Sequence, residues 1–255
     1  TVDYFVASPD GSRVAVALSP GGSESASLFV FDTATGQRLA GPVDRADPGF
    51  ATWSADSRRL YVTRLQALSA GADRVEKYRN ATVDAWDLSS PPVTILGATA
   101  GRGPAFSPDE TPVLRLWPTA SVAVLASLNG TQNDMSLWTK PASRLEDAAA
   151  AWPPLAARTD DITAVEAAGD ILYLLSHKGA PTYEVLSLRP GQALSEARVL
   201  VPAQDSRVIE SMHVASDALY VLARHRAYSV LLRVAHGSGQ VEEIALPFKG
   251  YVREA

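Results

Sequence analysis

Cysteine is absent from all 255 residues of the chain, and this absence removes several kinds of chemistry at once. Disulfide bonds, thiolate metal sites and a cysteine nucleophile are excluded. The compartment stays open, because lack of cysteine does not distinguish oxidising from reducing surroundings. Any chemistry must therefore use oxygen and nitrogen groups, and we expect a soluble protein of the cytoplasm or the periplasm.

Basic clusters and long apolar runs are also missing. The formal net charge is -5 and the pI is near 5.4, which argues against nucleic acid as a partner because phosphate binding needs a basic face. The longest apolar stretches, at 121–128 and 171–175, have the length of strands and are far too short to cross a membrane. We therefore expect neither a nucleic-acid nor a membrane partner. The chain opens at Thr1 without an initiator Met or a leader, so we expect a processed or cut N-terminus.

The most regular pattern is a turn followed by an alternating strand near the N-terminus. In Ser8-Pro9-Asp10-Gly11, the proline presets φ, the aspartate can accept bonds from backbone amides beyond it, and the glycine accepts a positive φ. In the segment 13–18, the larger apolar residues Val14, Val16 and Leu18 alternate with Arg13, Ala15 and Ala17, so the two sets fall on opposite faces of a strand.

Weaker copies of this turn return along the whole chain, whereas helical periodicity is nearly absent. The markers are Asp10, Asp56, Asp109, Asp170 and Asp217, and their spacing of roughly 45 to 60 residues is close to that of propeller repeats. Four short strands fit each interval, so the sequence predicts an all-β fold, a β-propeller of four-stranded antiparallel blades. We expect a single propeller or partial propeller over residues 1–255, with about five blades at 2–49, 50–103, 104–159, 160–207 and 208–250.

The third repeat and the connection at 66–79 depart from the regular pattern. In the third repeat, Pro112 and Pro118 interrupt any central strand, because proline is restricted to edges and bends. We expect strands at 121–127 and 136–140, and one or two helical turns within 144–151. The connection Gln66–Arg79 is long and rich in charge. It is either a solvated loop or a contact with a partner or substrate.

An ordered set of motifs resembles the propeller domain of prolyl oligopeptidase-type serine peptidases. In chain order, the set is Asp3-Tyr4-Phe5, Ser8-Pro9-Asp10-Gly11, Val14-Ala15-Val16, Leu18-Ser19-Pro20-Gly21-Gly22-Ser23-Glu24, Trp53-Ser54-Ala55-Asp56-Ser57 and Leu60-Tyr61-Val62-Thr63-Arg64. The resemblance implies a seven-bladed propeller that covers an α/β-hydrolase domain and admits short peptides to a Ser-Asp-His triad. This chain supplies about five blades and ends before a hydrolase domain, so it is expected to be a fragment of a larger peptidase. The implied partners are the hydrolase domain of the parent chain and a short peptide substrate.

No segment has the pattern of a catalytic serine in a hydrolase. Gly-x-Ser-x-Gly on a strand-to-helix elbow is absent, and the partial matches at Ser23 and Ser238 lie in turns between predicted strands. The adjacent acidic pairs Asp160-Asp161 and Glu242-Glu243 would point to opposite faces of a strand, so neither forms an acid/base dyad by itself. We predict no catalytic residue, no cofactor-binding residue and no cofactor.

The four histidines lack the close spacing of a helical metal motif, so no metal site is predicted. His177 and His225 occupy equivalent strand ends, which leaves open either separate polar ends or a shared ligand. Sequons at Asn80 and Asn129 matter only in a secretory eukaryotic context. The tryptophans fit packing between blades better than a stacking surface for sugars or peptides, and they are Trp53, Trp86, Trp117, Trp138 and Trp152.

Three functions are compatible with these patterns. The first is a non-catalytic propeller that filters substrates for a prolyl oligopeptidase-like enzyme, with the loop Gln66–Arg79 as a candidate for interdomain contact. The second is a free-standing propeller that binds a protein or peptide. The third is a five-bladed glycosidase, which would need inward-facing carboxylates on several blades.

Overall fold

The computed structural model describes residues 1–23, 25–46 and 49–252. Glu24, the last residue of the Gly-Gly-Ser-Glu motif, and the terminal residues 253–255 lie outside these ranges. The chain divides into two compact units. The first comprises Thr1–Pro118, Ala123–Gln132 and Leu137–Pro153, and the second comprises Thr119–Val122, Asn133–Ser136 and Pro154–Ala255.

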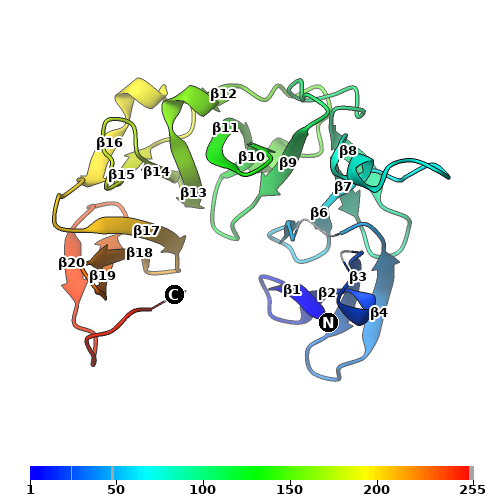
Figure 1. Cartoon of the computed structure of the whole chain (residues 1–255), viewed down its shortest axis with the longest axis horizontal. Coiled ribbons are helices and arrows are strands. Elements are labelled where there is room, and N and C mark those ends of the chain that lie inside the picture. Colours follow the sequence, from blue (N-terminus) through cyan, green and yellow to red (C-terminus); the bar gives the residue numbers. More distant parts are fainter. Residues whose placement is uncertain (24, 47–48, 253–255) are drawn as a thin grey trace. The chain divides into compact units, whose positions relative to one another are not determined.

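The described residues form five four-stranded antiparallel sheets, in which consecutive strands are neighbours (Figure 1). The first sheet contains β1 (Val2–Ala7), β2 (Arg13–Leu18), β3 (Ser27–Asp32) and β4 (Arg38–Val43). The second contains β5 (Ala51–Trp53), β6 (Leu60–Arg64), β7 (Thr82–Trp86) and β8 (Val93–Gly97). The third contains β9 (Glu110–Arg115), β10 (Val122–Asn129), β11 (Gln132–Pro141) and β12 (Pro154–Ala156).

The last two sheets belong to the second unit and have the same strand order. The fourth contains β13 (Ile162–Ala168), β14 (Ile171–Ser176), β15 (Glu184–Leu188) and β16 (Arg198–Val201). The fifth contains β17 (Val208–Val214), β18 (Ala218–His225), β19 (Tyr228–Ala235) and β20 (Val241–Ile244). The predicted all-β fold of four-stranded antiparallel sheets is therefore confirmed.

Helical structure among the described residues is limited to 3₁₀ segments of three to five residues. They are η1 (Pro20–Gly22), η2 (Arg74–Tyr78), η3 (Ala142–Arg144), η4 (Arg158–Asp160) and η5 (Leu194–Glu196). The helical turn expected within 144–151 is thus the short η3, which lies slightly earlier in the chain. No helix in the described ranges is long and apolar enough to cross a membrane.

Side chains between adjacent sheets form the core of the first unit. Leu28 and Val30 of the first sheet pack with Trp53, Leu60 and Val62 of the second. The Trp53 indole also donates a hydrogen bond to the carbonyl of Val6 at 3.0 Å. The central strand β6 is buried on both faces, because Leu60 and Val62 pack against the first sheet and Tyr61 packs with Leu114 and Leu125 of the third.

The turn at Ser8 connects β1 and β2, and its side chains bond as the sequence predicts. Asp10 Oδ1 accepts hydrogen bonds from the Ser8 hydroxyl at 2.6 Å and from the Ser12 amide at 3.0 Å. The Asp10 amide donates to the hydroxyl of Ser57 in the β5–β6 turn at 3.2 Å. Equivalent turns of the first two sheets are therefore neighbours in space.

The third repeat differs from the prediction. Asp109 lies before β9, the first strand of its sheet, rather than between the first and second strands. Pro112 lies within β9 opposite Ser127 of β10, a position that a proline can occupy because β9 is an edge strand. The turn equivalent to Ser8–Gly11 is 116–121, and β10 and β11 extend further toward each other than the predicted strands do.

Candidate functional site

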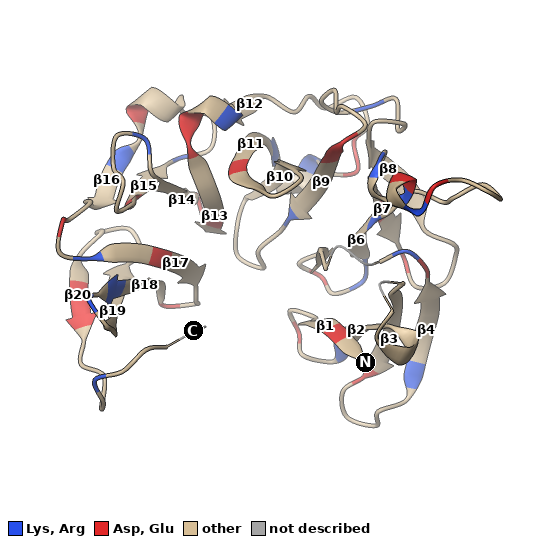
Figure 2. Cartoon of the chain, in the orientation of Figure 1, with Lys and Arg blue, Asp and Glu red and all other residues tan. Residues whose placement is uncertain are grey.

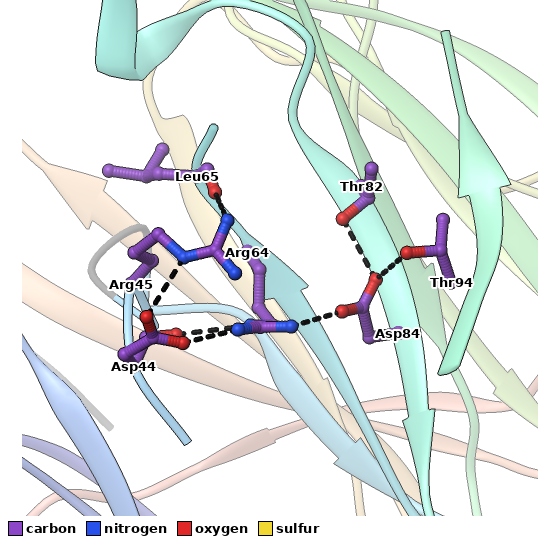
Figure 3. Close-up of polar contacts among 7 residues, drawn as sticks. All are labelled: Asp44, Arg45, Arg64, Leu65, Thr82, Asp84 and Thr94. Carbon is purple, nitrogen blue, oxygen red and sulfur yellow. Dashed lines mark hydrogen bonds and ion pairs between the residues drawn. The ribbon is translucent and has the colours of Figure 1, made fainter. Parts of the chain in front are cut away.

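Arg64 lies between two carboxylates in the first unit (Figure 3). Its Nη1 donates to Asp84 Oδ2 at 2.6 Å, its Nη2 pairs with Asp44 Oδ1, and its Nε donates to the Asp44 carbonyl at 3.1 Å. Arg64 ends β6, Asp84 lies in the middle of β7, and Asp44 follows β4. Because Arg64 pairs with Thr82 across the sheet, Asp84 is its diagonal neighbour on the same face.

The Asp84 carboxylate is almost fully buried, and each of its oxygens has a donor. Its Oδ1 accepts hydrogen bonds from the Thr82 and Thr94 hydroxyls, both at 2.8 Å, and its Oδ2 accepts from Arg64. Burial acts to lower the pKa of Arg64, but the hydrogen bonds with Asp84 and Asp44 outweigh it and raise the pKa above its ordinary value. The guanidinium therefore stays charged at any ordinary pH.

Arg45 extends this network to the segment that follows β6. Its Nη1 donates to the Leu65 carbonyl at 3.0 Å, and the Leu65 amide donates to the Arg45 carbonyl at 2.9 Å. Its Nε also pairs with Asp44 at 3.1 Å. The segments after β4 and β6 are thus joined by backbone and side-chain bonds.

A polar depression with a volume of about 270 Å³ lies over this network, and Arg45, Arg64, Gln66, Asn80, Thr82, Asp84, Thr94 and Thr99 contribute to its lining. Most of these polar groups already bond to one another. The Arg64 guanidinium is held by two carboxylates, and the Asp84 carboxylate is held by three donors. Such an arrangement fixes positions but offers no poised base beside a nucleophile. The network can therefore hold these segments of the chain in place, but it has no groups arranged for catalysis.

The segment that this site anchors is the loop Gln66–Arg79. The Gln66 amide donates to the Lys77 carbonyl at 3.0 Å, and its side-chain Nε2 donates to the Glu76 carbonyl at 3.0 Å. The Asn80 side chain then donates to Gln66 Oε1 at 2.8 Å. Both ends of the loop are thus fastened beside the depression.

Away from this base, the loop exposes apolar side chains among charged ones. Val75 is 61% exposed, Tyr78 is 46% exposed and Leu68 is 39% exposed. Figure 2 shows acidic and basic residues on the same segment between β6 and β7. The Lys77 ammonium lies 4.7 Å from the centre of the Tyr78 ring. Contiguous apolar patches rimmed by polar residues mark contact surfaces, and these three side chains make the loop a candidate for one.

The two serines with partial nucleophile motifs lie in turns, as predicted. The Ser23 amide closes the η1 turn by donating to the Pro20 carbonyl at 3.0 Å. The Ser238 amide donates to the His236 carbonyl at 2.9 Å, between β19 and β20. The His236 imidazole contacts the Tyr173 hydroxyl at 2.8 Å rather than a serine.

His177 and His225 make similar ring contacts, with Tyr183 at 5.4 Å and Tyr228 at 5.3 Å between centres. The structure brings His177 instead to two aspartates of the second unit, Asp134 and Asp161. Sequence reasoning missed this cluster because Asp134 and His177 are 43 residues apart and no spacing rule connects them.

In each of the two adjacent acidic pairs, one member forms an ion pair with a basic residue. Asp160 pairs with Lys178 at 2.6 Å, and Glu242 pairs with Arg233 at 3.1 Å.

Two of the five tryptophans fully fit the prediction of packing. Trp53 and Trp86 are each 4% exposed and belong to the core shared by the first two sheets. Trp138 packs on Phe106 with 5.7 Å between ring centres.

At the first sequon, the Asn80 side chain bonds to Gln66 and the Thr82 hydroxyl bonds to Asp84, so both side chains are engaged within the chain.

Comparison with known families identifies the class of protein. The model of the prolyl oligopeptidase N-terminal beta-propeller domain matches residues 1–84 and 120–255, and the chain belongs to this family. The gap in the match includes β9 and the prolines that disturb the third repeat. No curated protein sequence matches the chain.

Solved structures share this fold over 98% of the chain. One belongs to a study of two prolyl endopeptidases and of inter-domain dynamics in their catalysis and specificity, with a TM-score of 0.81 and 20% identity. Prolyl oligopeptidase B from Galerina marginata, as the apo protein, has a TM-score of 0.78 and 16% identity. A mutant of the same fungal enzyme, bound to a 35mer hydrolysis and macrocyclization substrate, also has a TM-score of 0.78 and 16% identity. The present chain spans 36% of the length of each of these proteins.

Proposed function

We propose that this chain is the non-catalytic propeller of a prolyl oligopeptidase-type serine peptidase and that it restricts which peptides reach the active site. Membership of the propeller family supports a peptidase parent. The share of each similar structure that the chain covers supports a second domain elsewhere in the parent. The chain itself contributes no catalytic residue.

The loop Gln66–Arg79 carries this proposal. Its base is held by Gln66 and Asn80, beside the buried pair of Arg64 and Asp84, whereas Val75 and Tyr78 expose apolar surface. A firmly based loop with an apolar surface suits repeated docking, because little conformational freedom is lost on each contact. We propose that this loop contacts the hydrolase domain of the parent and so controls access for short peptides.

The test uses the enzyme expressed from the complete gene, with Val75→Asp and Tyr78→Asp as variants. A charge on the docking surface should weaken closure, so hydrolysis of a long prolyl peptide should rise several-fold relative to a short one. Val93→Asp is the matched control, because Val93 is 60% exposed on β8 of the same sheet. An unchanged ratio in both loop variants would contradict the role of the loop.

Two further results bear on the domain assignment. The isolated chain should not hydrolyse a prolyl peptide, and turnover that copurifies with it would overturn the non-catalytic role. If the complete gene encodes no hydrolase domain, the chain is instead a free-standing propeller that binds a protein or peptide.

A further inference from the structure

Three ligating side chains converge in the second unit. The Asp134 and Asp161 carboxylates and the His177 imidazole place one ligand atom each within 4.8 Å of the others. Asp134 lies in β11, Asp161 directly precedes β13, and His177 directly follows β14. We propose that these three residues bind a divalent transition-metal ion, with Zn²⁺ as the expected occupant.

Backbone bonds hold the three ligands in place without the ion. The His177 amide donates to the Asp161 carbonyl at 3.0 Å, continuing the antiparallel register in which Ile162 faces Ser176. The Arg158 guanidinium donates to the Asp134 carbonyl at 2.8 Å. The Tyr183 ring lies 5.4 Å from the His177 ring, centre to centre, and limits its rotation. Little rearrangement is therefore needed to bring the ligands to a metal.

The charges in this cluster favour a cation. His177 Nε2 and Asp134 Oδ1 are 2.7 Å apart, so one carboxylate is hydrogen-bonded to the imidazole. Within the described ranges, the Asp161 side chain accepts no hydrogen bond. The neighbouring Lys178 ammonium forms its ion pair with Asp160 at 2.6 Å and interacts with the Asp161 carboxylate only through its electric field. A divalent cation would bridge both carboxylates and replace the single hydrogen bond with three coordinate bonds.

The donor set selects the type of metal. Imidazole nitrogen with carboxylate oxygens suits Zn²⁺ and related ions, whereas Ca²⁺ and Mg²⁺ prefer oxygen ligands alone. Three protein ligands and one water complete a tetrahedral Zn²⁺ site. His177 and Asp134 side chains are 34% and 31% exposed, so an ion can reach them from solvent. The ion would join β11 to the ends of the β13–β14 hairpin.

Isothermal titration of the EDTA-treated chain with ZnCl₂ at neutral pH tests the site. We expect one Zn²⁺ per chain and a higher melting temperature in its presence, because binding to the folded state stabilises it. The variants Asp161→Asn and His177→Gln should bind at least about tenfold more weakly. Asparagine suits position 161, whose φ is 56°, so this variant should keep the fold.

Asp160→Asn is the matched control, because it removes the adjacent carboxylate that pairs with Lys178 and should leave Zn²⁺ affinity unchanged. MgCl₂ should give no stoichiometric binding. Failure of the unmodified chain to bind Zn²⁺ would overturn the proposal. If Asp161→Asn and His177→Gln bind Zn²⁺ as tightly as the unmodified chain does, the proposal is also overturned, since the ion would then occupy other residues.

Discussion

Arg64 Nη1 lies 2.6 Å from Asp84 Oδ2 and joins the last residue of β6 to the middle of β7. The arginine side chain is 13% exposed and the aspartate side chain 2% exposed, so removal of one partner leaves a charge in a poorly solvated place. Arg64→Met should therefore lower the free energy of unfolding of the first unit by about 3 kcal/mol. Tryptophan fluorescence during urea unfolding measures this, because all five tryptophans belong to that unit.

Two further variants separate the cost of an unpaired charge from the loss of packing. Arg64→Met combined with Asp84→Leu should recover part of the stability, because no buried charge remains. Arg144→Met is the control, since Arg144 forms an exposed pair with Asp147 and should change stability by less than about 1 kcal/mol. Equal losses for Arg64→Met and Arg144→Met would contradict the importance of burial.

Gln66→Ala should loosen the loop Gln66–Arg79 without unfolding the sheets. The substitution removes the bond to the Glu76 carbonyl and the acceptor for Asn80. Local opening should expose Arg74 and Lys77 to trypsin, so cleavage there should become several-fold faster. Mass spectrometry of timed digests identifies the cleavage sites. Gln132→Ala, at the exposed start of β11, should digest like the unmodified chain.

Tyr173→Phe should destabilise the second unit by about 1 kcal/mol through loss of one buried hydrogen bond. The Tyr173 hydroxyl is 2.8 Å from His236 Nδ1, and His236 Nε2 is 3.0 Å from the Ala215 carbonyl. Hydrogen exchange of β14 and β18 amides measures this stability. Tyr220→Phe, whose hydroxyl bonds to exposed Asp217, should have a smaller effect. A larger loss for Tyr220→Phe would show that burial of the hydroxyl is not decisive.

Gly97→Ala should destabilise the second sheet for a steric reason. Gly97 has a φ of 123°, and a Cβ there would lie 2.6 Å from the Ala81 carbonyl oxygen. Such crowding costs about 1–3 kcal/mol in addition to the backbone strain. Gly101→Ala separates the two effects, since its φ of 67° is also positive but a Cβ there would meet no atom within 4 Å. Thermal unfolding should show a clearly lower midpoint for Gly97→Ala than for Gly101→Ala.

Asp10 should titrate below its ordinary range. Hydrogen bonds from the Ser8 side chain and from Ser12 lower the pKa of this carboxyl below 3.8. Because the folded-state pKa is the lower one, the contribution to stability is complete above about pH 5 and is lost progressively as pH falls through the folded-state pKa. Carbon NMR of the Asp10 carboxyl should follow this titration. In Ser8→Ala the pKa should move toward 3.8, and an unchanged pKa would contradict the hydrogen-bond cause.

Much of the fold could be predicted because its signals are local. Alternation of side chains locates β2, a short apolar run locates β14, and turn residues such as Pro9 and Gly11 mark where the chain reverses. Prediction failed in the third repeat, where Asp109 has the residues of the turn but precedes an edge strand. There, pairing of β9 with β10 decides the register, and that pairing is a long-range interaction.

The sequence by itself determined an all-β chain of repeated four-stranded units and its resemblance to the oligopeptidase propellers. Tertiary structure alone decided that Arg64 lies between Asp44 and Asp84, and that His177 meets Asp134 and Asp161. The physical reason is that strand formation depends on residues a few positions apart. These polar clusters instead depend on the packing of separate sheets and loops, which leaves no regular spacing in the chain.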